Sequence, residues 1–494
     1  MKSKYCVVIR FLSIFYNNRE IFSCMTPSTF LSSMLILLLV FTWRPLRAQD
    51  GETLYKTYCA GCHGANLEGN SASTLIKTDW KYGRTSGLMT RNITYGIPGT
   101  EMIGWNQVLV GDQIKSLVSY ISKSQKIHPN RERPVPETIE TSDYTLKVEE
   151  WVETRAIRTP WAIEFISKDS ALISERRGVL RWIVKGEALE SPVEDVPQTQ
   201  EFRTGGYMDI AIDPNYKNNG WIYLALSYAP ENITDNMAPA MTKIVRGQIA
   251  NNMWSNEQVL FEVPDNLLVT EGNRWGCRFL FDKEGYLYFS IGDMNYEEDA
   301  LDPSKPVAKI YRINPDGTVP KDNPFINTPG ALAQVYTIGN RNVQGISQHP
   351  KTDDIWFTEH GPMGGDELNI LQKGGNYGWP VITYGLNYDG SVVSGKTEQE
   401  GMLQPVVHWT PSIAVCAAEF CNSNTFPKWK NELFVGALAF EEVRKLSINK
   451  KNEVIAQEMI LKGFGRVRDL KFGPDGALYV VLNQPDKILR ITRD

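Results

Sequence analysis

The sequence predicts an all-β six-bladed β-propeller preceded by a small all-α domain, and three observations lead to this fold class. One pattern, an apolar run followed by a Pro/Asp/Gly turn and a short β-rich strand, recurs six times within residues 143–494. Residues 50–125 instead place apolar side chains at helical spacing around a short cysteine motif. Residues 126–142 are rich in charged residues and proline, which is typical of a linker between domains.

Residues 1–48, which precede the helical domain, are expected to be a signal peptide. Leu31–Phe41 is an apolar run with the length of a signal h-region, and Arg44, Arg47 and Ala48 follow it. A bilayer span needs about 20 apolar residues, so this run is too short for a comfortable span. We therefore expect an exported protein, periplasmic or extracellular, that associates with a membrane only if the leader stays uncleaved.

The net charge limits the possible binding partners, and the cysteine content limits the possible disulfides. The formal net charge is −5 and no basic tract stands out, which argues against nucleic acid as a partner. The cysteines beyond the leader are Cys59, Cys62, Cys277, Cys416 and Cys421. In an oxidising compartment Cys416 has two possible disulfide partners, Cys277 and Cys421, and the sequence leaves this pairing open.

The cysteine motif of the helical domain is Cys59-Ala60-Gly61-Cys62-His63. In c-type haem attachment two such thiols bond to the macrocycle and the adjacent histidine supplies an axial nitrogen. A thioredoxin-like Cys-x-x-Cys is the alternative, but no strand–helix context precedes the motif and a histidine follows it directly. The motif therefore predicts covalently bound haem c, with His63 as an iron ligand.

The sixth iron ligand is expected to be Met102, which ends a Gly/Pro-rich loop that begins at Tyr95. Met89 is the alternative ligand, and core packing is the ordinary role of either methionine. A His/Met pair raises the haem potential, which suits an electron acceptor. With this motif and Met102, the segment resembles a small class I cytochrome c.

The six recurring strands of the second part are expected at Ser170–Ser174, Gly220–Ser227, Gly285–Asp293, Asp353–His360, Asn431–Leu438 and Gly476–Asn483. A second alternating strand follows several of them, at Val179–Val184, Lys309–Ile313, Val443–Ile448 and Lys487–Ile491. Tandem immunoglobulin-like units or an irregular sandwich would also give strands and turns. The sixfold recurrence favours radial repetition, in which loops from all blades surround one central opening.

Polar residues concentrate near the third to sixth of these strands, where such an opening would gather them. They are Asp293, Arg341, Asn342, Gln344, His360, Asp366, Glu367, Arg466 and Arg468. Arg466 and Arg468 are two residues apart, so on a strand both point the same way. This places them either on a solvated face or in the channel, where guanidinium groups bind the carboxylates of a ligand.

The segment 359–369 is the strongest candidate for a metal site. Gly361 and Pro362 offer backbone carbonyls in an irregular turn, and Asp366 and Glu367 supply carboxylate oxygens nearby. Calcium takes about six to eight such oxygens. A generic acidic loop is the alternative interpretation, and the segment alone does not decide between them.

Residues from about 145 to 494 resemble the soluble quinoprotein sugar dehydrogenases of the glucose/sorbosone dehydrogenase family. The stretches that carry the resemblance are GGYMDIAIDPNYKNNGWIYLALS, GYLYFSIGD, VYTIGNRNVQGISQHP, EHGPMGGDELNILQKGGNYGWP and GRVRDLKFGPDGALYV. The resemblance implies a six-bladed propeller that uses pyrroloquinoline quinone (PQQ) and calcium. It implies these ligand contacts: Arg341, Asn342, Arg466 and Arg468 for the quinone, the Gly361 and Pro362 carbonyls for its calcium, and Glu367 and Tyr377 for a second calcium.

Three positions depart from the family's pattern. Arg274 stands where the family has its general-base histidine, and an arginine stays protonated in proteins. A quinone-contacting lysine is replaced at about Ala439, and an active-site glutamine at about Thr204. His360 is the predicted substitute base, with Asp293 next, because both match channel positions of the family.

Together these features predict an exported quinohaem oxidoreductase. It would oxidise an aldose sugar or a similar alcohol in the propeller, and the tethered haem would pass the electrons to an external acceptor. A tether raises the local concentration of haem at the quinone site. The alternative is a ligand-binding propeller without catalysis, attached to a cytochrome c that shuttles electrons on its own.

Overall fold

The structure is a computed structural model that describes residues 50–63, 67, 72, 75, 85–97, 102–126, 135–153, 156–199, 201, 204–229, 239–270, 272–387 and 391–494. The expected signal peptide and residues 127–134 of the expected linker lie outside this range. Among the described helices, none is both long and apolar enough to cross a bilayer.

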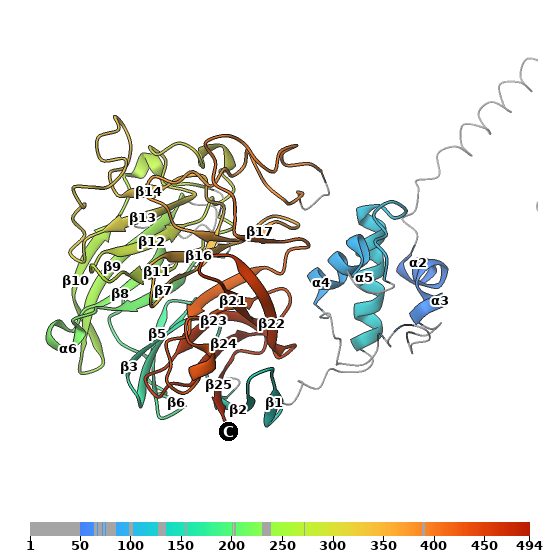
Figure 1. Cartoon of the computed structure of the whole chain (residues 1–494), viewed down its shortest axis with the longest axis horizontal. Helices are drawn as coiled ribbons and strands as arrows, with labels where there is room; N and C mark the ends of the chain where they lie inside the picture. Colours follow the sequence, from blue (N-terminus) through green and yellow to red (C-terminus); the bar gives the residue numbers. More distant parts are fainter. Residues whose placement is uncertain are drawn as a thin grey trace, which may run out of the picture.

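A small helical domain comes first in the chain (Figure 1). Its helices are α2 (Gly51–Tyr58), α3 (Ala60–His63), α4 (Ser86–Tyr95) and α5 (Gly111–Lys126). The Asp50 carboxylate accepts a hydrogen bond from Thr53 N and the Thr85 hydroxyl accepts one from Leu88 N, so each side chain caps a helix start. The apolar residues expected on one helical face of α5 are all buried, namely Ile114, Leu117, Val118 and Ile121.

Six antiparallel sheets follow and form the blades of a propeller (Figure 1). The first three sheets contain β3 (Pro160–Ser167), β4 (Ser170–Glu175), β5 (Val179–Val184) and β6 (Glu187–Ala188); β7 (Tyr207–Ile212), β8 (Ile222–Tyr228), β9 (Met241–Ala250) and β10 (Met253–Phe261); and β11 (Phe279–Phe281), β12 (Leu287–Ile291), β13 (Lys309–Ile313) and β14 (Val335–Thr337). A one-turn helix, α6 (Tyr216–Asn219), lies between β7 and β8.

The other three sheets complete the ring. They contain β15 (Val343–Gln348), β16 (Ile355–Glu359), β17 (Asp366–Ile370) and β18 (Val407–Trp409); β19 (Val415–Phe420), β20 (Leu433–Ala437), β21 (Glu442–Ile448) and β22 (Val454–Lys462); and β23 (Arg466–Phe472), β24 (Leu478–Asn483) and β25 (Lys487–Arg493) with β1 (Thr138–Glu140) and β2 (Thr145–Val152).

The six recurring strands expected from the sequence coincide with β4, β8, β12, β16, β20 and β24, which are the second strands of the six blades. The four companion strands coincide with β5, β13, β21 and β25. The predicted fold class is therefore confirmed. The second strand of a blade is buried on both faces, so its apolar run is the strongest pattern in each repeat.

Two features close the ring. The last blade pairs β25 from the C-terminal end with β2 from the start of the propeller, in the register Val148↔Ile491. The first strands of successive blades also contact one another around the ring, and β23 contacts β3. Residues at the ends of these strands therefore meet at the axis even when they are distant in the sequence.

Arg278 links the blades at the centre of the ring. Its Nη1 lies 3.0 Å from an Asp469 carboxylate oxygen and 3.4 Å from one of Asp209, and its Nε donates to Gln344 O at 2.7 Å. A buried charge is tolerated only when it is paired and hydrogen-bonded, as here. Residues of three other blades thus fix this side chain.

The disulfides that the sequence left open are absent from the structure. Cys59, Cys62, Cys277, Cys416 and Cys421, the cysteines of the described residues, are all free. Cys277, Cys416 and Cys421 are each buried in the propeller. The propeller is therefore held together by apolar packing and by strand pairing between its first and last parts.

Candidate active site

The central site is built from segments that enter or leave the inner strands of several blades. Asn342 precedes β15 and His360 follows β16, and the His360 backbone N donates to Asn342 O at 3.1 Å. Arg466 and Arg468 lie on β23, and their charges act on the His360 ring together with that of Arg341. The structure thus brings these five predicted residues into one site.

Arg341 has buried hydrogen-bond donors that lack a partner. Its Nη1 donates to the carbonyls of His360 and Gly361, at 2.9 and 2.8 Å. Its Nε and Nη2 are buried and have no hydrogen-bond partner. Buried donors without partners are costly, so this guanidinium is prepared to bind an acceptor that enters the site.

Arg468 and Arg466 add two further positive charges. The Arg468 guanidinium lies 4.3 Å over the Trp161 ring, and its Nη1 donates to Gln344 Oε1 at 3.2 Å. Within the described part of the chain, neither arginine forms an ion pair with a carboxylate. Burial lowers the pKa of Arg468 to about 10, so the side chain remains a cation at neutral pH. Two cations without an ion-pair partner among the described residues would suit an anionic ligand.

His360 is held neutral by its surroundings. Burial, and then the charges of Arg341, Arg468 and Arg466, lower the pKa of its imidazole to about 3. Its Nδ1 lies 3.5 Å from Asn342 Nδ2, and its Nε2 is buried without a partner. A neutral imidazole has a lone pair that can accept a proton, but a pKa near 3 makes it a weak base until the surrounding positive charge is neutralised.

Asp293 is engaged by two side chains. One carboxylate oxygen lies 2.7 Å from Arg274 Nε, and the other accepts a hydrogen bond from Trp379 Nε1 at 2.9 Å. Arg274 also contacts Glu297 at 3.1 Å. With both oxygens of Asp293 occupied, His360 is the better placed of the two predicted bases, and the role of each stays a prediction.

Arg274, which the resemblance predicts to stand at the family's base position, has a backbone that needs a neighbouring glycine. Its φ is +64°, and a Cβ on Gly292 would lie 1.8 Å from the Arg274 carbonyl oxygen. Burial raises the pKa of Asp293, and the Arg274 charge opposes that rise. Arg274 therefore acts as the counter-ion of a buried carboxylate.

Some of the oxygens near the calcium site expected at Gly361 and Pro362 already accept hydrogen bonds from the protein. The Gly361 carbonyl already accepts Arg341 Nη1, and the Asp366 oxygens accept from Gly361 N, Ser412 Oγ and Val415 N. Asp366 thus shapes the turn, and its role as an oxygen donor to a metal stays a prediction.

A second group of oxygens lies behind this turn. Glu359 and Glu367 are directly opposite one another on β16 and β17, and Asn369 Nδ2 donates to both, at 3.2 and 3.1 Å. Burial raises the pKa of Glu359 to about 7 and that of Glu367 to about 8. Asn369 Oδ1 is buried without a partner. This donor set fits a hard cation such as calcium.

Tyr377, the other predicted ligand of this second metal, contributes no hydroxyl oxygen. Its O–H donates to Ile370 O at 2.7 Å and accepts from Gln372 N at 2.9 Å. Only its backbone carbonyl remains for a cation. Glu359 and Asn369 are functional candidates that the sequence reasoning missed, although the strand register of β16 and β17 places them beside Glu367.

Thr204 and Ala439 are the two other positions at which a departure from the family's pattern is predicted. Thr204 is exposed to solvent. Ala439 is half-buried, and its backbone N donates to Ile413 O at 3.0 Å. Neither side chain carries the amine or the carboxamide that the resemblance leads us to expect there.

The haem motif lies at the junction of α2 and α3. The backbone N atoms of Cys62 and His63 both donate to Cys59 O, at 3.2 and 3.0 Å, so the motif forms one helical turn. Cys59 is buried, Cys62 is exposed and His63 is half-buried. Two thiols and an adjacent imidazole on one turn fit covalent haem.

The predicted methionine ligand packs against the core of the same domain. Met102 packs against the buried cluster that includes Cys59 and Met89. The backbone N of Ile97 donates to Met102 O at 2.9 Å, and Gly96 forms a bridge with Ile103. The loop that ends at Met102 is thereby tied to the end of α4, and the choice of Met102 over Met89 stays a prediction.

A propeller with a cationic central site, joined to a helical domain with a c-type haem motif, defines a redox protein of two parts. The family model described as Glucose / Sorbosone dehydrogenase matches residues 157–490, and the one described as Cytochrome C oxidase, cbb3-type, subunit III matches residues 46–121. The chain belongs to the glucose/sorbosone dehydrogenase family and carries a cytochrome c domain. It is a sugar dehydrogenase-like oxidoreductase.

Similar proteins agree with this assignment. Aldose sugar dehydrogenase YliI of Escherichia coli (strain K12) is 37% identical over 331 residues, which cover 66% of this chain and 87% of that protein. The apo form of the soluble aldose sugar dehydrogenase of Escherichia coli superposes with a TM-score of 0.66 at 33% identity, covering 71% of this chain and all of the other. The PQQ-bound aldose sugar dehydrogenase of Streptomyces coelicolor has a TM-score of 0.57 at 21% identity, covering 71% and 98%, and shares the fold.

Proposed function

We propose that this protein is an exported dehydrogenase that oxidises an aldose sugar or a similar alcohol in the propeller. PQQ and calcium would serve as cofactors there, and the electrons would pass to haem c and then to an external acceptor. The family membership supports the reaction class, and the Cys59–His63 motif supports the haem.

The observation that carries the proposal is the arginine cluster with its unpartnered donors. Arg341 Nε and Nη2 have no partner, and Arg466 and Arg468 direct two more cations into the same site. PQQ is a planar tricarboxylate that supplies a two-electron acceptor when bound. Guanidinium groups bind carboxylates in a bidentate way, so three arginines match its three carboxylates in charge.

His360 is the proposed base. Its pKa, and therefore its strength as a base, would depend on whether an anionic ligand is bound beside it. Burial, together with the three arginines, lowers its pKa to about 3. Carboxylates bound among them would cancel that charge and raise the pKa of His360. The imidazole Nε2 would then accept the proton of the substrate hydroxyl. Arg274 and Asp293 neutralise each other at the wall of the site, which leaves them a positioning role.

The calcium of the quinone site would need the Gly361 carbonyl, which Arg341 occupies. This oxygen has a second lone pair, so it and the Pro362 carbonyl oxygen would hold the ion. Glu359, Glu367 and Asn369 fit the second, structural calcium. The haem would be held by Cys59, Cys62 and His63, with Met102 as its other iron ligand.

The test uses the full exported chain loaded with haem. Calcium and PQQ are added, and the haem absorbance is followed during additions of a panel of aldoses. Haem reduction that depends on the sugar and needs both additions supports the proposal. Absence of reduction with every aldose, together with absence of PQQ binding, would favour a propeller that binds a ligand without turning it over.

A matched variant tests the base. His360→Ala should abolish most sugar-dependent reduction, because general-base catalysis contributes about 10²–10⁴-fold. PQQ binding, followed by calorimetry, separates loss of the base from loss of the cofactor. Full sugar oxidation by the variant would remove His360 from the mechanism.

A further inference from the structure

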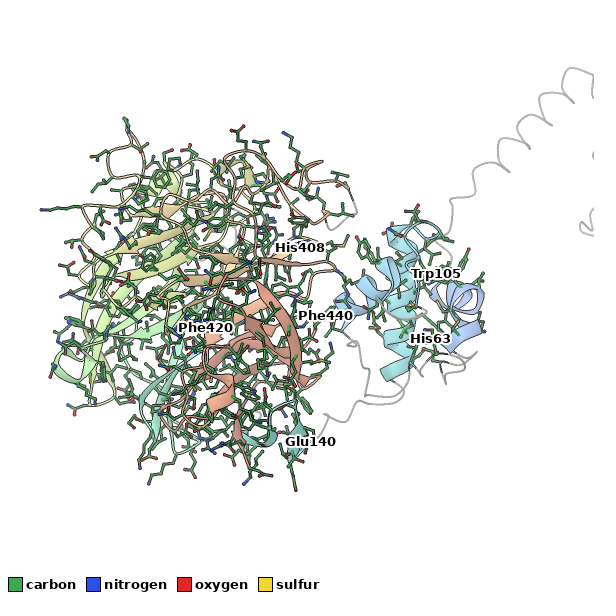
Figure 2. The ribbon with its side chains drawn as sticks, in the orientation of Figure 1. His63, Trp105, Glu140, His408, Phe420 and Phe440 are labelled. Atoms are coloured by element: carbon green, nitrogen blue, oxygen red, sulfur yellow. The ribbon has the colours of Figure 1, made fainter. Side chains whose placement is uncertain are left out.

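The helical domain meets the propeller through one face of α4. Figure 1 places α4 on the side of the helical domain that faces the propeller, and Figure 2 places Phe440 on the propeller edge near it. The Arg91 guanidinium lies 3.8 Å from the centre of the Phe440 ring, and its Nη1 lies 3.4 Å from Ser412 O. The same ring is 4.7 Å from Lys462 Nζ. Phe440 is therefore an aromatic partner shared by a cation of each domain.

The charges around Arg91 belong to the propeller. Glu442 pairs with Lys462 at 2.6 Å, and its charge, with that of Asp366, stabilises the Arg91 cation. Burial against the propeller has the opposite effect and lowers the pKa of Arg91 to about 10. The side chain thus remains charged while it loses water, which is the condition in which a cation–aromatic contact is strongest.

The second contact of α4 reaches the loop of the central site. The Tyr95 hydroxyl donates to Met363 Sδ at 3.3 Å. Met363 follows Gly361 and Pro362 directly, and the Gly361 carbonyl is the one that binds Arg341. A single short loop therefore touches both the arginine cluster and the helical domain.

Tyr95 is also connected to Met102, the predicted iron ligand, through the residues that follow α4. Tyr95 ends α4, Gly96 bridges to Ile103, and Ile97 N donates to Met102 O at 2.9 Å. A route of bonded and hydrogen-bonded atoms thus runs from the site loop through Met363 and Tyr95 to Met102.

We propose that the α4 face carrying Arg91 and Tyr95 is the docking surface through which the haem domain receives electrons from the propeller, with Arg91 as its positioning residue. The inference rests on the proposed function. The contact is small, but a tether supplies an effective concentration on the order of millimolar, so a weak contact is enough to populate the docked arrangement.

The transfer from the sugar through the haem to an external acceptor balances in electrons and protons. Oxidation of one aldose C1 hydroxyl to the lactone releases two electrons and two protons. Ferric haem takes one electron at a time and becomes ferrous. A one-electron acceptor such as ferricyanide reoxidises it between the two transfers, and the protons leave to solvent.

The experiment compares Arg91→Ala with Lys115→Ala in the full chain. Lys115 is an exposed cation of α5 that pairs with Asp112 at 3.1 Å. Each variant is mixed with aldose, calcium and PQQ, and haem reduction is timed by stopped flow. Turnover with a freely diffusing dye that takes electrons directly from the propeller is measured alongside. The intact haem spectrum confirms folding of the helical domain.

Arg91→Ala should slow haem reduction about fivefold, as expected for loss of a partly desolvated cation–aromatic contact. Dye turnover should stay at the value of the Lys115→Ala control. Arg91→Lys, which keeps a cation over Phe440, should restore most of the rate. Unchanged haem reduction in Arg91→Ala and in Tyr95→Phe would overturn the docking surface.

Amide hydrogen exchange, measured without PQQ, tests the docking surface independently of catalysis. The α4 amides and those near Phe440 should be protected in the parent chain and less protected in Arg91→Ala, even if no aldose is oxidised. Absence of sugar-dependent turnover with both acceptors would refute the proposed function alone. Equal exchange in the two chains would refute the docking surface alone.

Discussion

The haem domain and the propeller build their sites in opposite ways. In the haem domain, Cys59, Cys62 and His63 lie on one helical turn, and local hydrogen bonds position them. In the propeller, Arg341, His360 and Arg468 come from two blades, and closure of the ring brings them together. A contiguous site depends on a few residues, whereas an assembled site depends on the whole ring. Variants that disturb one site should therefore leave the other largely unaffected.

The largest expected effect comes from variants of the haem motif, which test whether the two sites are independent. In the double variant Cys59→Ser/Cys62→Ser, covalent haem should be lost completely, because both thioether bonds need a thiol. The propeller's calorimetric unfolding transition should stay within a few degrees of the parent value. Cys421→Ser, which alters a buried propeller cysteine, is the control and should retain haem. A large fall of the propeller transition in the double variant would show that the two regions are coupled.

The next effect tests the assembled site. Arg274→Gln leaves the buried Asp293 carboxylate without its cation, and breaking such a pair costs about 3–5 kcal/mol. Burial already raises the pKa of Asp293, so the group stabilises the folded state at low pH, and that stability is lost as the pH rises through the folded pKa. Denaturant titrations at pH 5 and pH 8 should therefore show the greater loss at pH 8.

The double variant Arg274→Gln/Asp293→Asn is the control for this loss. It removes the unpaired charge, so it should regain part of the stability at pH 8. Equal destabilisation of the single and double variants would mean that the Arg274–Asp293 pair contributes nothing specific.

The third expected effect is on the binding of PQQ at the assembled site of the propeller. Arg341→Ala should weaken PQQ binding roughly tenfold to a hundredfold, which is the range for losing a charge-assisted hydrogen bond. Calorimetric titration measures the affinity. Arg246→Ala is the control, because that guanidinium bonds Gln258 between the outer strands β9 and β10. Equal affinities of the two variants would contradict the assignment of Arg341 to the quinone.

The smallest effect is a pH dependence of calcium stabilisation. Glu359 and Glu367, with pKa values raised by burial to about 7 and about 8, hold protons below this range. Calcium must displace these protons, so its affinity should rise with pH, by roughly tenfold per unit for each proton released. Without calcium, their contribution to stability is lost as the pH rises through about 7 to 8.

Thermal unfolding with and without calcium at pH 6 and pH 8.5 measures this dependence. The increase in Tm should be larger at pH 8.5 and should shrink in Glu367→Gln. The haem domain's own transition serves as the internal control. The same calcium shift at both pH values would remove these two carboxylates from the metal site.

The sequence alone predicted the features whose determinants are local. The haem motif is complete within five residues, and the six recurring strands were found because each second strand of a blade is an apolar run bounded by turn residues. The arginine cluster was predicted only in part from the residues, since a strand face and a channel give the same spacing for Arg466 and Arg468. The family resemblance added the ligand assignments.

Other parts of the site could not be predicted, because they depend on register and on contacts between distant segments. Glu359 becomes a partner of Glu367 only through the pairing of β16 with β17. Arg341 occupies the Gly361 carbonyl, which the sequence had assigned to calcium. Asp366 was expected to offer oxygens nearby, yet three donors from its surroundings use them.

By itself, the sequence determined the two-part architecture and the haem motif, because both rest on periodicity and on neighbours along the chain. The tertiary structure decided which charges are paired and which are free. Arg274 is neutralised by Asp293, whereas Arg341 keeps two unpartnered donors and His360 is held neutral. Ring closure sets these distances, and burial turns them into differences in pKa and in hydrogen bonding, which no local pattern of residues contains.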